Sequence, residues 1–201
     1  VVMLHGNPSW SFYWRHLVTG LRDKYRCIVP DHVGMGLSDR PDDAKYTYTL
    51  QSRIDDLDAL LAHLGIDGPV TLAVHDWGGM IGFGWALRDP ARVKRLVITN
   101  TAAFPLPQAK RFPKRLAMGR DSRLGGWLIR KFNLFARGAA WFGTERALPK
   151  DVRNTYAGVY DGWTQAISTL RFMQDIPLDE GDRAWPLLKA AEAALPGYAN
   201  R

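Results

Sequence analysis

The most informative segment of the chain is Val74-His75-Asp76-Trp77-Gly78-Gly79, residues 74–79. Residues 69–74 before it read PVTLAV, a short apolar run rich in β-branched residues that favours a buried strand. Residues 80–87 after it are largely apolar and run to Pro90, and a proline there ends a helix. The segment therefore predicts a strand, a sharp turn at Asp76 and a helix.

This arrangement is the context of a nucleophile elbow, in which the side chain at the turn attacks the substrate. Asp76 occupies the position of the nucleophile, and Gly78 and Gly79 permit the close backbone approach that the turn needs. Aspartate is also a favoured helix N-cap, so the hexapeptide by itself leaves capping and catalysis as equal alternatives. With the motifs below, we interpret Asp76 as a catalytic residue that forms a covalent ester.

A second motif begins the chain, where the strand-like run VVML breaks into His5-Gly6-Asn7-Pro8. The side-chain amide of Asn7 can donate two hydrogen bonds, and the indole of Trp77 can donate one. Donors aimed at developing negative charge are what acyl or alkyl transfer requires. Asn-Pro alone is a turn former and a lone tryptophan is more often core. Both residues become candidates because a neighbouring strand carries the elbow.

A third motif spans residues 27–38, CIVPDHVGMGLS, which read as a strand followed by a glycine-rich loop. The loop lacks the third glycine of a dinucleotide-binding fingerprint, and the following Arg40-Pro41 does not open a helix smoothly. We therefore interpret the loop as structural and expect no nucleotide or other cofactor. No spacing typical of a zinc site is present in the sequence either.

In this order, the three motifs resemble the haloalkane dehalogenase branch of the α/β-hydrolase superfamily. Three further segments are most similar to the bacterial β-lactone decarboxylases of long-chain olefin biosynthesis: HGNPSWSFYWR (5–15), NTAAFP (100–105) and TLRFMQDIP (169–177). The resemblance implies an α/β fold with a mostly parallel sheet, helices on both faces and an inserted helical cap. It also implies site roles: Asp76 as nucleophile, Asn7 and the indole of Trp77 as holders of the leaving anion or lactone oxygen, and the backbone N–H groups of Asn7 and Trp77 as the oxyanion hole.

The activity implied by the resemblance is the opening of a long-chain cis-β-lactone, with loss of carbon dioxide to give an alkene. Hydrolytic displacement of halide from a haloalkane uses the same residues and stays an alternative. An epoxide hydrolase would need cap tyrosines, for which Tyr156 and Tyr160 are the candidates. An inert chain or an interaction module is the remaining alternative, because the usual catalytic base is missing.

All five histidines (His5, His16, His32, His63 and His75) lie before Asp76, whereas the catalytic histidine of α/β-hydrolases follows the nucleophile. We expect His75 to point away from Asp76, and His5 and His32 to be structural. Asn100-Thr101 stand where some dehalogenases carry the acid. We therefore expect the triad histidine and acid to lie beyond Arg201, the chain to be truncated at both ends, and this fragment to be inactive alone.

The pattern of the chain predicts three parts. Residues 1–104 alternate between strands and helices and form a partial α/β-hydrolase core, residues 105–185 form a helical cap, and residues 186–201 begin the return to the core. The expected strands lie near 1–4, 27–30, 70–74 and 95–99, and the expected helices near 13–22, 50–64, 79–88 and 187–195, the last ended by Pro196-Gly197.

Composition agrees with a soluble enzyme, for which a bacterial cytoplasm is the default location, and the resemblance implies a small hydrophobic substrate. Of 201 residues, 46% are hydrophobic, and the single cysteine, Cys27, excludes an intrachain disulfide. No apolar run approaches the roughly 20 residues that span a bilayer. Eight aromatic residues give the cap more apolar surface than a two- or three-carbon halide requires. Part of this surface must pack the cap against the sheet, and the rest would line a long apolar pocket: Phe104, Phe112, Trp127, Phe132, Phe135, Trp141, Phe142 and Trp163.

The positive charge of the chain, +7 overall, is concentrated in the cap. Residues 104–140 contain nine basic residues and one acidic residue, Asp121: Lys110, Arg111, Lys114, Arg115, Arg120, Arg123, Arg130, Lys131 and Arg137. The seven-residue spacing of Arg123, Arg130 and Arg137 predicts one basic helix face, with Leu124, Trp127, Leu128, Leu134 and Phe135 on the other side. A solvated face is the ordinary explanation. An acidic partner protein or a membrane surface is the alternative, and nucleic acid is not expected.

Overall fold

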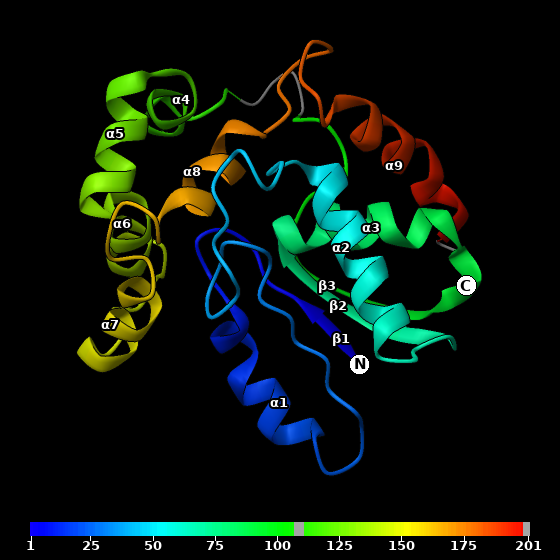
Figure 1. The fold of residues 1–201 in the computed structure, drawn as a ribbon. Coiled ribbons are helices and arrows are strands. Elements are labelled where there is room, and N and C mark those ends of the chain that lie inside the picture. Colours follow the sequence, from blue (N-terminus) through cyan, green and yellow to red (C-terminus); the bar gives the residue numbers. More distant parts are fainter. Residues whose placement is uncertain (107–110, 199–201) are drawn as a thin grey trace.

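The computed structural model of the chain describes residues 1–106 and 111–198. In this part of the chain a three-stranded parallel sheet lies at the centre, with the order β1-β2-β3 (Figure 1). The strands are β1 (Val2–Leu4), β2 (Val70–Asp76) and β3 (Val93–Thr101). Leu4 pairs with Val74, and Val74 pairs with Ile98. Because the strands are parallel, the segments that follow Leu4, Val74 and Ile98 meet at the carboxyl edge of the sheet.

Successive side chains of β1 and β2 point to opposite faces of the sheet, and each face is covered by its own layer of helices. Val2, Leu4, Leu72 and Val74 pack with residues of α2 (Leu50–His63) and α3 (Trp77–Arg88). Met3 and Ala73 belong to a separate cluster with residues of η1 (Ser11–Trp14) and α1 (Arg15–Leu21). Helices therefore cover both faces of the sheet, as the sequence predicted. A last helix, α9 (Trp185–Tyr198), packs against α3 (Figure 1).

Two predicted elements differ from the structure. Residues 27–30, all of them described, form only a single bridge between Ile28 and Val2, because Pro30 has no N–H with which to extend the ladder. Helix α9 continues through Pro196 to Tyr198 instead of ending before it. Pro196 is exposed and close to the helix end, where the carbonyl that loses its partner can bond to water.

The cap is formed by helices that lie together beyond the carboxyl edge of the sheet (Figure 1). They are α4 (Lys114–Asp121), α5 (Arg123–Phe132), α6 (Leu134–Phe142), α7 (Lys150–Gly158) and α8 (Ile167–Gln174). The cap is joined to the core at more than one point, since Phe172 of α8 and Ala136 of α6 both belong to the main hydrophobic cluster of the sheet. The exact limits of the core and of the cap stay a prediction, and Lys110 lies outside the described residues.

The prediction that Arg123, Arg130 and Arg137 share one helix is wrong, because Asn133 separates α5 from α6. Asn133 adopts a left-handed conformation, with φ +51° and ψ +37°. Its buried side-chain amide donates to the carbonyl oxygen of Ala157 at 2.7 Å and to Oδ1 of Asp161 at 2.8 Å. Asparagine tolerates the left-handed conformation better than most residues. This conformation ends α5 at Asn133, and the two side-chain hydrogen bonds hold the residue in place.

Several of the large apolar residues expected on the side of this helix opposite the arginines are exposed. Leu124, Trp127 and Leu134 are exposed. Helix α5 instead packs through small residues, Gly125 against the backbone of Met118 and Gly126 against Leu170. A side chain at Gly125 would collide with α4, so close packing of the cap leaves Leu124 and Trp127 exposed, while Ile129 packs against Leu170 and Met173.

Candidate active site

The turn between β2 and α3 is a strained elbow with Asp76 at its tip. Asp76 has φ +51° and ψ −126°, a conformation that L-residues rarely adopt and that concentrates at functional sites. The turn is closed by glycines: a Cβ on Gly78 would overlap the carbonyl oxygen of Leu4, and a Cβ on Gly6 would overlap the Asp76 carboxylate. The loop after β1 and the elbow therefore lie in direct contact.

Two backbone amides converge on the carboxylate of Asp76. The N–H of Asn7 donates to Oδ1 at 2.7 Å, and the N–H of Trp77 also donates to this carboxylate. These are the two amides that were predicted to form the oxyanion hole. Burial raises the pKa of Asp76, while the two amides and the neighbouring His75 oppose this rise by favouring the anion.

The side chains predicted to bind the leaving anion lie in different environments. Nδ2 of Asn7 donates to the carbonyl oxygen of Thr169 in α8 at 3.0 Å, whereas its buried Oδ1 finds no hydrogen-bond partner among the described residues. Asn7 thus ties the loop after β1 to the cap. The ring of Trp77 is buried and packs edge-on against Phe172, with the ring centroids 5.1 Å apart. The roles of Asn7 and Trp77 as anion donors stay a prediction.

A cavity of about 430 Å³ lies between the elbow and the cap. This volume is within the range of small-molecule sites. The sheet side contributes polar groups, among them Asn7, His75, Asp76 and Asn100, and α6 contributes a largely apolar wall. In the described part of the chain, Trp77 does not line this cavity, and Phe135 is the only one of the eight predicted cap aromatics that does. Six of the others are exposed: Phe104, Trp127, Phe132, Trp141, Phe142 and Trp163.

His75 lines the same cavity as Asp76, and the expectation that its side chain points away from Asp76 stays a prediction. The pairing of β2 with β3 is irregular between His75 and Asp76, and the positive φ of Asp76 changes the side-chain alternation at this point. The His75 ring stacks on Tyr13 with the centroids 4.3 Å apart, and its buried Nδ1 has no hydrogen-bond partner in residues 1–106 and 111–198. Burial lowers the pKa of His75, which favours the neutral ring of a potential base.

His5 and His32 form a buried pair behind the site. A ring nitrogen of His32 lies 3.0 Å from the carbonyl oxygen of His5, and the backbone N–H of His32 donates to Nε2 of His5 at 3.3 Å. Burial lowers the pKa of both rings. These contacts fix the loops after Leu4 and Pro30 against each other, which supports the structural role that the sequence suggested for both residues.

The two candidate cap tyrosines lie in different environments. Tyr156 lines the cavity and accepts a hydrogen bond from Nη1 of Arg15 at 3.0 Å. Tyr160 is fully buried and donates to the carbonyl oxygen of Ser9 at 3.1 Å, so it has a structural position. Tyr13 also lines the cavity and was missed from the sequence, because it sits in a short 3₁₀ turn with no motif of its own.

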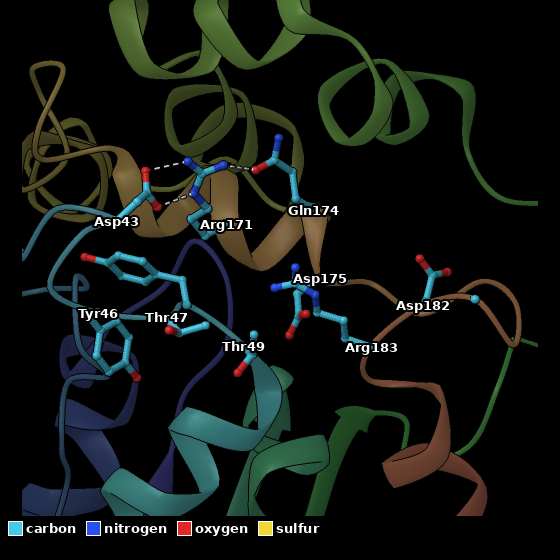
Figure 2. A pocket seen from close by; sticks show the side chains of 11 residues that line it. Asp43, Tyr46, Thr47, Thr49, Arg171, Gln174, Asp175, Asp182 and Arg183 are labelled. Carbon is cyan, nitrogen blue, oxygen red and sulfur yellow. Dashed lines mark hydrogen bonds and ion pairs between the residues drawn. The ribbon is translucent and has the colours of Figure 1, made fainter.

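A second cavity, of about 500 Å³, lies between the loop before α2 and the residues that follow α8 (Figure 2). Two of its charged side chains are paired, since Arg171 binds Asp43 through two hydrogen bonds of 2.7 and 2.5 Å. The two cavities share no lining residue in the described ranges. The elbow therefore marks the candidate active site, although the other cavity is larger. Nowhere in the described part of the chain are three His, Cys, Asp or Glu side chains grouped as metal ligands would be.

Known proteins share both the sequence and the fold of this chain. A family described as "alpha/beta hydrolase fold" matches residues 1–161. A cis-3-alkyl-4-alkyloxetan-2-one decarboxylase of Xanthomonas campestris pv. campestris is 66% identical, over 100% of this chain and 69% of the relative. The protein of the same name from Shewanella oneidensis is 54% identical, over 100% of this chain and 63% of the relative.

Among solved structures, the haloalkane dehalogenase DbeA from Bradyrhizobium elkani superposes with a TM-score of 0.85 at 28% identity, covering 98% of this chain and 68% of that chain. The predicted resemblance to haloalkane dehalogenases and to β-lactone decarboxylases is thus confirmed. The chain belongs to the alpha/beta hydrolase fold family.

Proposed function

We propose that Asp76 opens a cis-β-lactone with two alkyl substituents and that the reaction ends in an alkene and carbon dioxide. The observation that carries this proposal is the Asp76 carboxylate at a strained elbow, hydrogen-bonded by two amides and lining a cavity beneath the cap. The substrate class is supported by the 66% identity to a protein named for decarboxylation of an oxetan-2-one, which is a β-lactone.

One balanced route uses Asp76 alone as the covalent catalyst. The carboxylate attacks the ring carbon that carries the ring oxygen, so that the carbon–oxygen bond of the ring breaks and a carboxylate is released on the adjacent carbon. Loss of carbon dioxide from that carboxylate leaves an electron pair that forms the carbon–carbon double bond and expels Asp76 as a free carboxylate. The route consumes no water and needs no general base.

The second candidate, a haloalkane dehalogenase, is supported by the similarity to DbeA. Its first step is the same attack by Asp76, but the resulting ester must then be hydrolysed by an activated water. No histidine follows Asp76 in this sequence, and His75 is the one histidine that lines the cavity in the described residues. An epoxide hydrolase is less well supported, because Tyr156 reaches the cavity and Tyr160 does not.

A direct comparison of substrates tests the proposal. We would assay alkene formation from a cis-dialkyl β-lactone and bromide release from a 1-bromoalkane, with Asp76→Ala as the control. Two proteins would be used: the 201-residue chain, and the same chain joined to the part of the Xanthomonas relative that has no counterpart here. We expect alkene formation to be the faster reaction and to be lost in Asp76→Ala. Faster bromide release would support a dehalogenase instead, and inactivity with both substrates would support a binding module.

We also propose that the outer face of α5 binds an acidic partner protein or a membrane surface. Arg123, Trp127 and Lys131 follow one another at four-residue spacing on the exposed side, opposite the packed Gly125 and Gly126. Within the described ranges neither Arg123 nor Lys131 forms an ion pair. No helix in the described residues is long and apolar enough to cross a bilayer. We also propose the cytoplasmic location that the composition of the chain suggested.

A further inference from the structure

A third cavity, of about 460 Å³, lies on the side of α6 that faces away from the elbow. Helices α4, α5, α6 and α8 all contribute to its walls. The side chains that line it are almost all apolar, and Arg115 is the one charged residue among them in the described part of the chain. The principal apolar residues are Leu116, Met118, Ile129, Leu134, Phe142 and Met173. We refer to this cavity as the outer cavity.

The outer cavity and the Asp76 cavity are separated by a single helix. Phe135 and Ala139 of α6 line both cavities. On the same helix, Ala140 lines the Asp76 cavity alone, and Gly138 lines the outer cavity alone. The partition between the two spaces is thus one phenyl ring, one methyl group and the helix backbone.

A dialkyl β-lactone of this class carries two apolar alkyl arms on adjacent ring carbons. The Asp76 cavity has polar groups at its sheet side, so it offers an apolar wall only on the cap side. Each methylene that moves from water to an apolar cavity strengthens binding by about fourfold. A long second arm therefore binds well only if a second apolar space adjoins the first.

We infer that the outer cavity binds one alkyl arm of the substrate while the lactone ring lies at Asp76, and that Phe135 controls passage between the two spaces. This inference rests on the proposed function. Phe135 is half-buried and is the larger of the two side chains that line both cavities, so rotation of its ring is the smallest movement that would widen the passage between them. Phe135 and the residues that fill the outer cavity are then determinants of chain-length specificity.

Gly138 allows a test that leaves the elbow untouched. A Cβ placed on Gly138 meets no described atom within 4 Å, and Gly138 lines the outer cavity, so a side chain can start at this position and should reduce the space of the cavity. Gly158 in α7 is a matched control, because its Cβ likewise meets none within the described ranges and it lines neither cavity. Replacing glycine within a helix does not by itself destabilise the fold.

The experiment compares Gly138→Phe with Gly158→Phe in two assays. The first measures kcat/KM for a lactone with two long arms and for lactones with one arm shortened to methyl. We expect Gly138→Phe to lower kcat/KM for the long substrate by about tenfold or more, and to leave a methyl-armed lactone nearly unchanged. The second assay titrates cis-parinaric acid, a fluorescent long-chain fatty acid. We expect Gly138→Phe to weaken its binding by a similar factor, and Gly158→Phe to have no effect.

The two assays separate the inference from the proposed function. Weaker binding of the fatty acid in Gly138→Phe, with no lactone turnover by any variant, would support the alkyl site and reject the proposed reaction. Lactone turnover with the same dependence on arm length in all variants, and equal fatty acid binding, would retain the reaction and overturn the alkyl site.

Discussion

The backbone N–H of Asn7 lies 2.7 Å from Oδ1 of Asp76, although the two residues are 69 positions apart in the sequence. The contact exists because β1 and β2 are parallel neighbours, so the loop after Leu4 and the elbow after His75 meet at one edge of the sheet. In this position the amide can stabilise either the anionic carboxylate of Asp76 or an oxyanion that forms beside it. One sheet edge therefore supplies both the proposed nucleophile and a donor.

We expect Gly6→Ala to inactivate the protein through this contact. The added methyl group would overlap the Asp76 carboxylate and displace it from its two amide donors. The expected loss is on the order of 10²-fold in kcat/KM with the lactone, similar to the loss of an oxyanion donor. Gly20→Ala is the control, because its Cβ meets no atom of the described residues within 4 Å. Equal activity of the two variants would show that the position of the carboxylate is not critical.

The side-chain donors are tested by Asn7→Ala and Trp77→Phe. Each variant removes one predicted donor and should reduce kcat by on the order of 10²-fold. Asn7→Ala should also lower the free energy of unfolding by about 1 kcal/mol, because the hydrogen bond to the carbonyl oxygen of Thr169 is lost. Rates equal to wild type in either variant would remove that residue from the site, and thermal unfolding would show whether the fold is intact.

The covalent intermediate should be visible with a haloalkane. Asp76 can be alkylated by a 1-bromoalkane, and the ester should persist because no histidine follows Asp76 in this chain. Intact mass spectrometry should therefore show at most one alkyl adduct per chain and stoichiometric release of bromide. His75→Gln is the informative companion, because His75 lines the cavity. If wild type releases bromide repeatedly and His75→Gln stops after one adduct, then His75 is the base.

Much of the fold was predictable from local pattern, because the elbow and the buried strands are contiguous in sequence. The strand–turn–helix around Asp76 and the placement of helices on both sheet faces follow from hydrophobic runs and glycines. The lining of the cavity was not predictable in the same way. The cap aromatics were expected to line it, yet Phe142 is 86% exposed and alanines of α6 form the wall. The orientation of cap helices depends on close packing at Gly125 and on the left-handed Asn133, which hydrophobic periodicity does not encode.

The exposed face of α5 should respond to charge reversal. We expect Arg123→Glu combined with Lys131→Glu to abolish binding to vesicles that contain anionic lipid, if the surface contacts membranes, and to leave the fold unchanged, because both side chains are exposed. Lys24→Glu, in the segment after α1, is the control, because Lys24 is exposed and forms no ion pair within the described ranges. Equal vesicle binding by all variants would contradict a membrane role. A wild-type chain that binds acidic protein but no vesicles would favour the partner protein.

Asp175 should make the stability of the chain depend on pH. It lies in the polar cavity of Figure 2, accepts a hydrogen bond from the N–H of Leu50 at 2.5 Å, and has Oδ2 3.9 Å from Nη1 of the buried Arg53. Burial raises the pKa of Asp175 from 3.8 to about 6, although Arg53, the Leu50 amide and Arg183 oppose the rise, and Asp182 adds to it.

Because this pKa is higher in the folded chain, folding is favoured when Asp175 is protonated. Its contribution to stability is therefore complete below about pH 4 and is lost as the pH rises through about 6. Relative to Asp175→Asn, which cannot titrate, the free energy of unfolding of wild type should fall by on the order of 2 kcal/mol between these limits. Urea unfolding of both proteins across this range measures the difference. Asp43→Asn is a control for which the change in the free energy of unfolding with pH should have the opposite sign, because the hydrogen bond from Arg171 lowers the pKa of Asp43. Parallel pH profiles for wild type and Asp175→Asn would show that Asp175 titrates as it does in the unfolded chain.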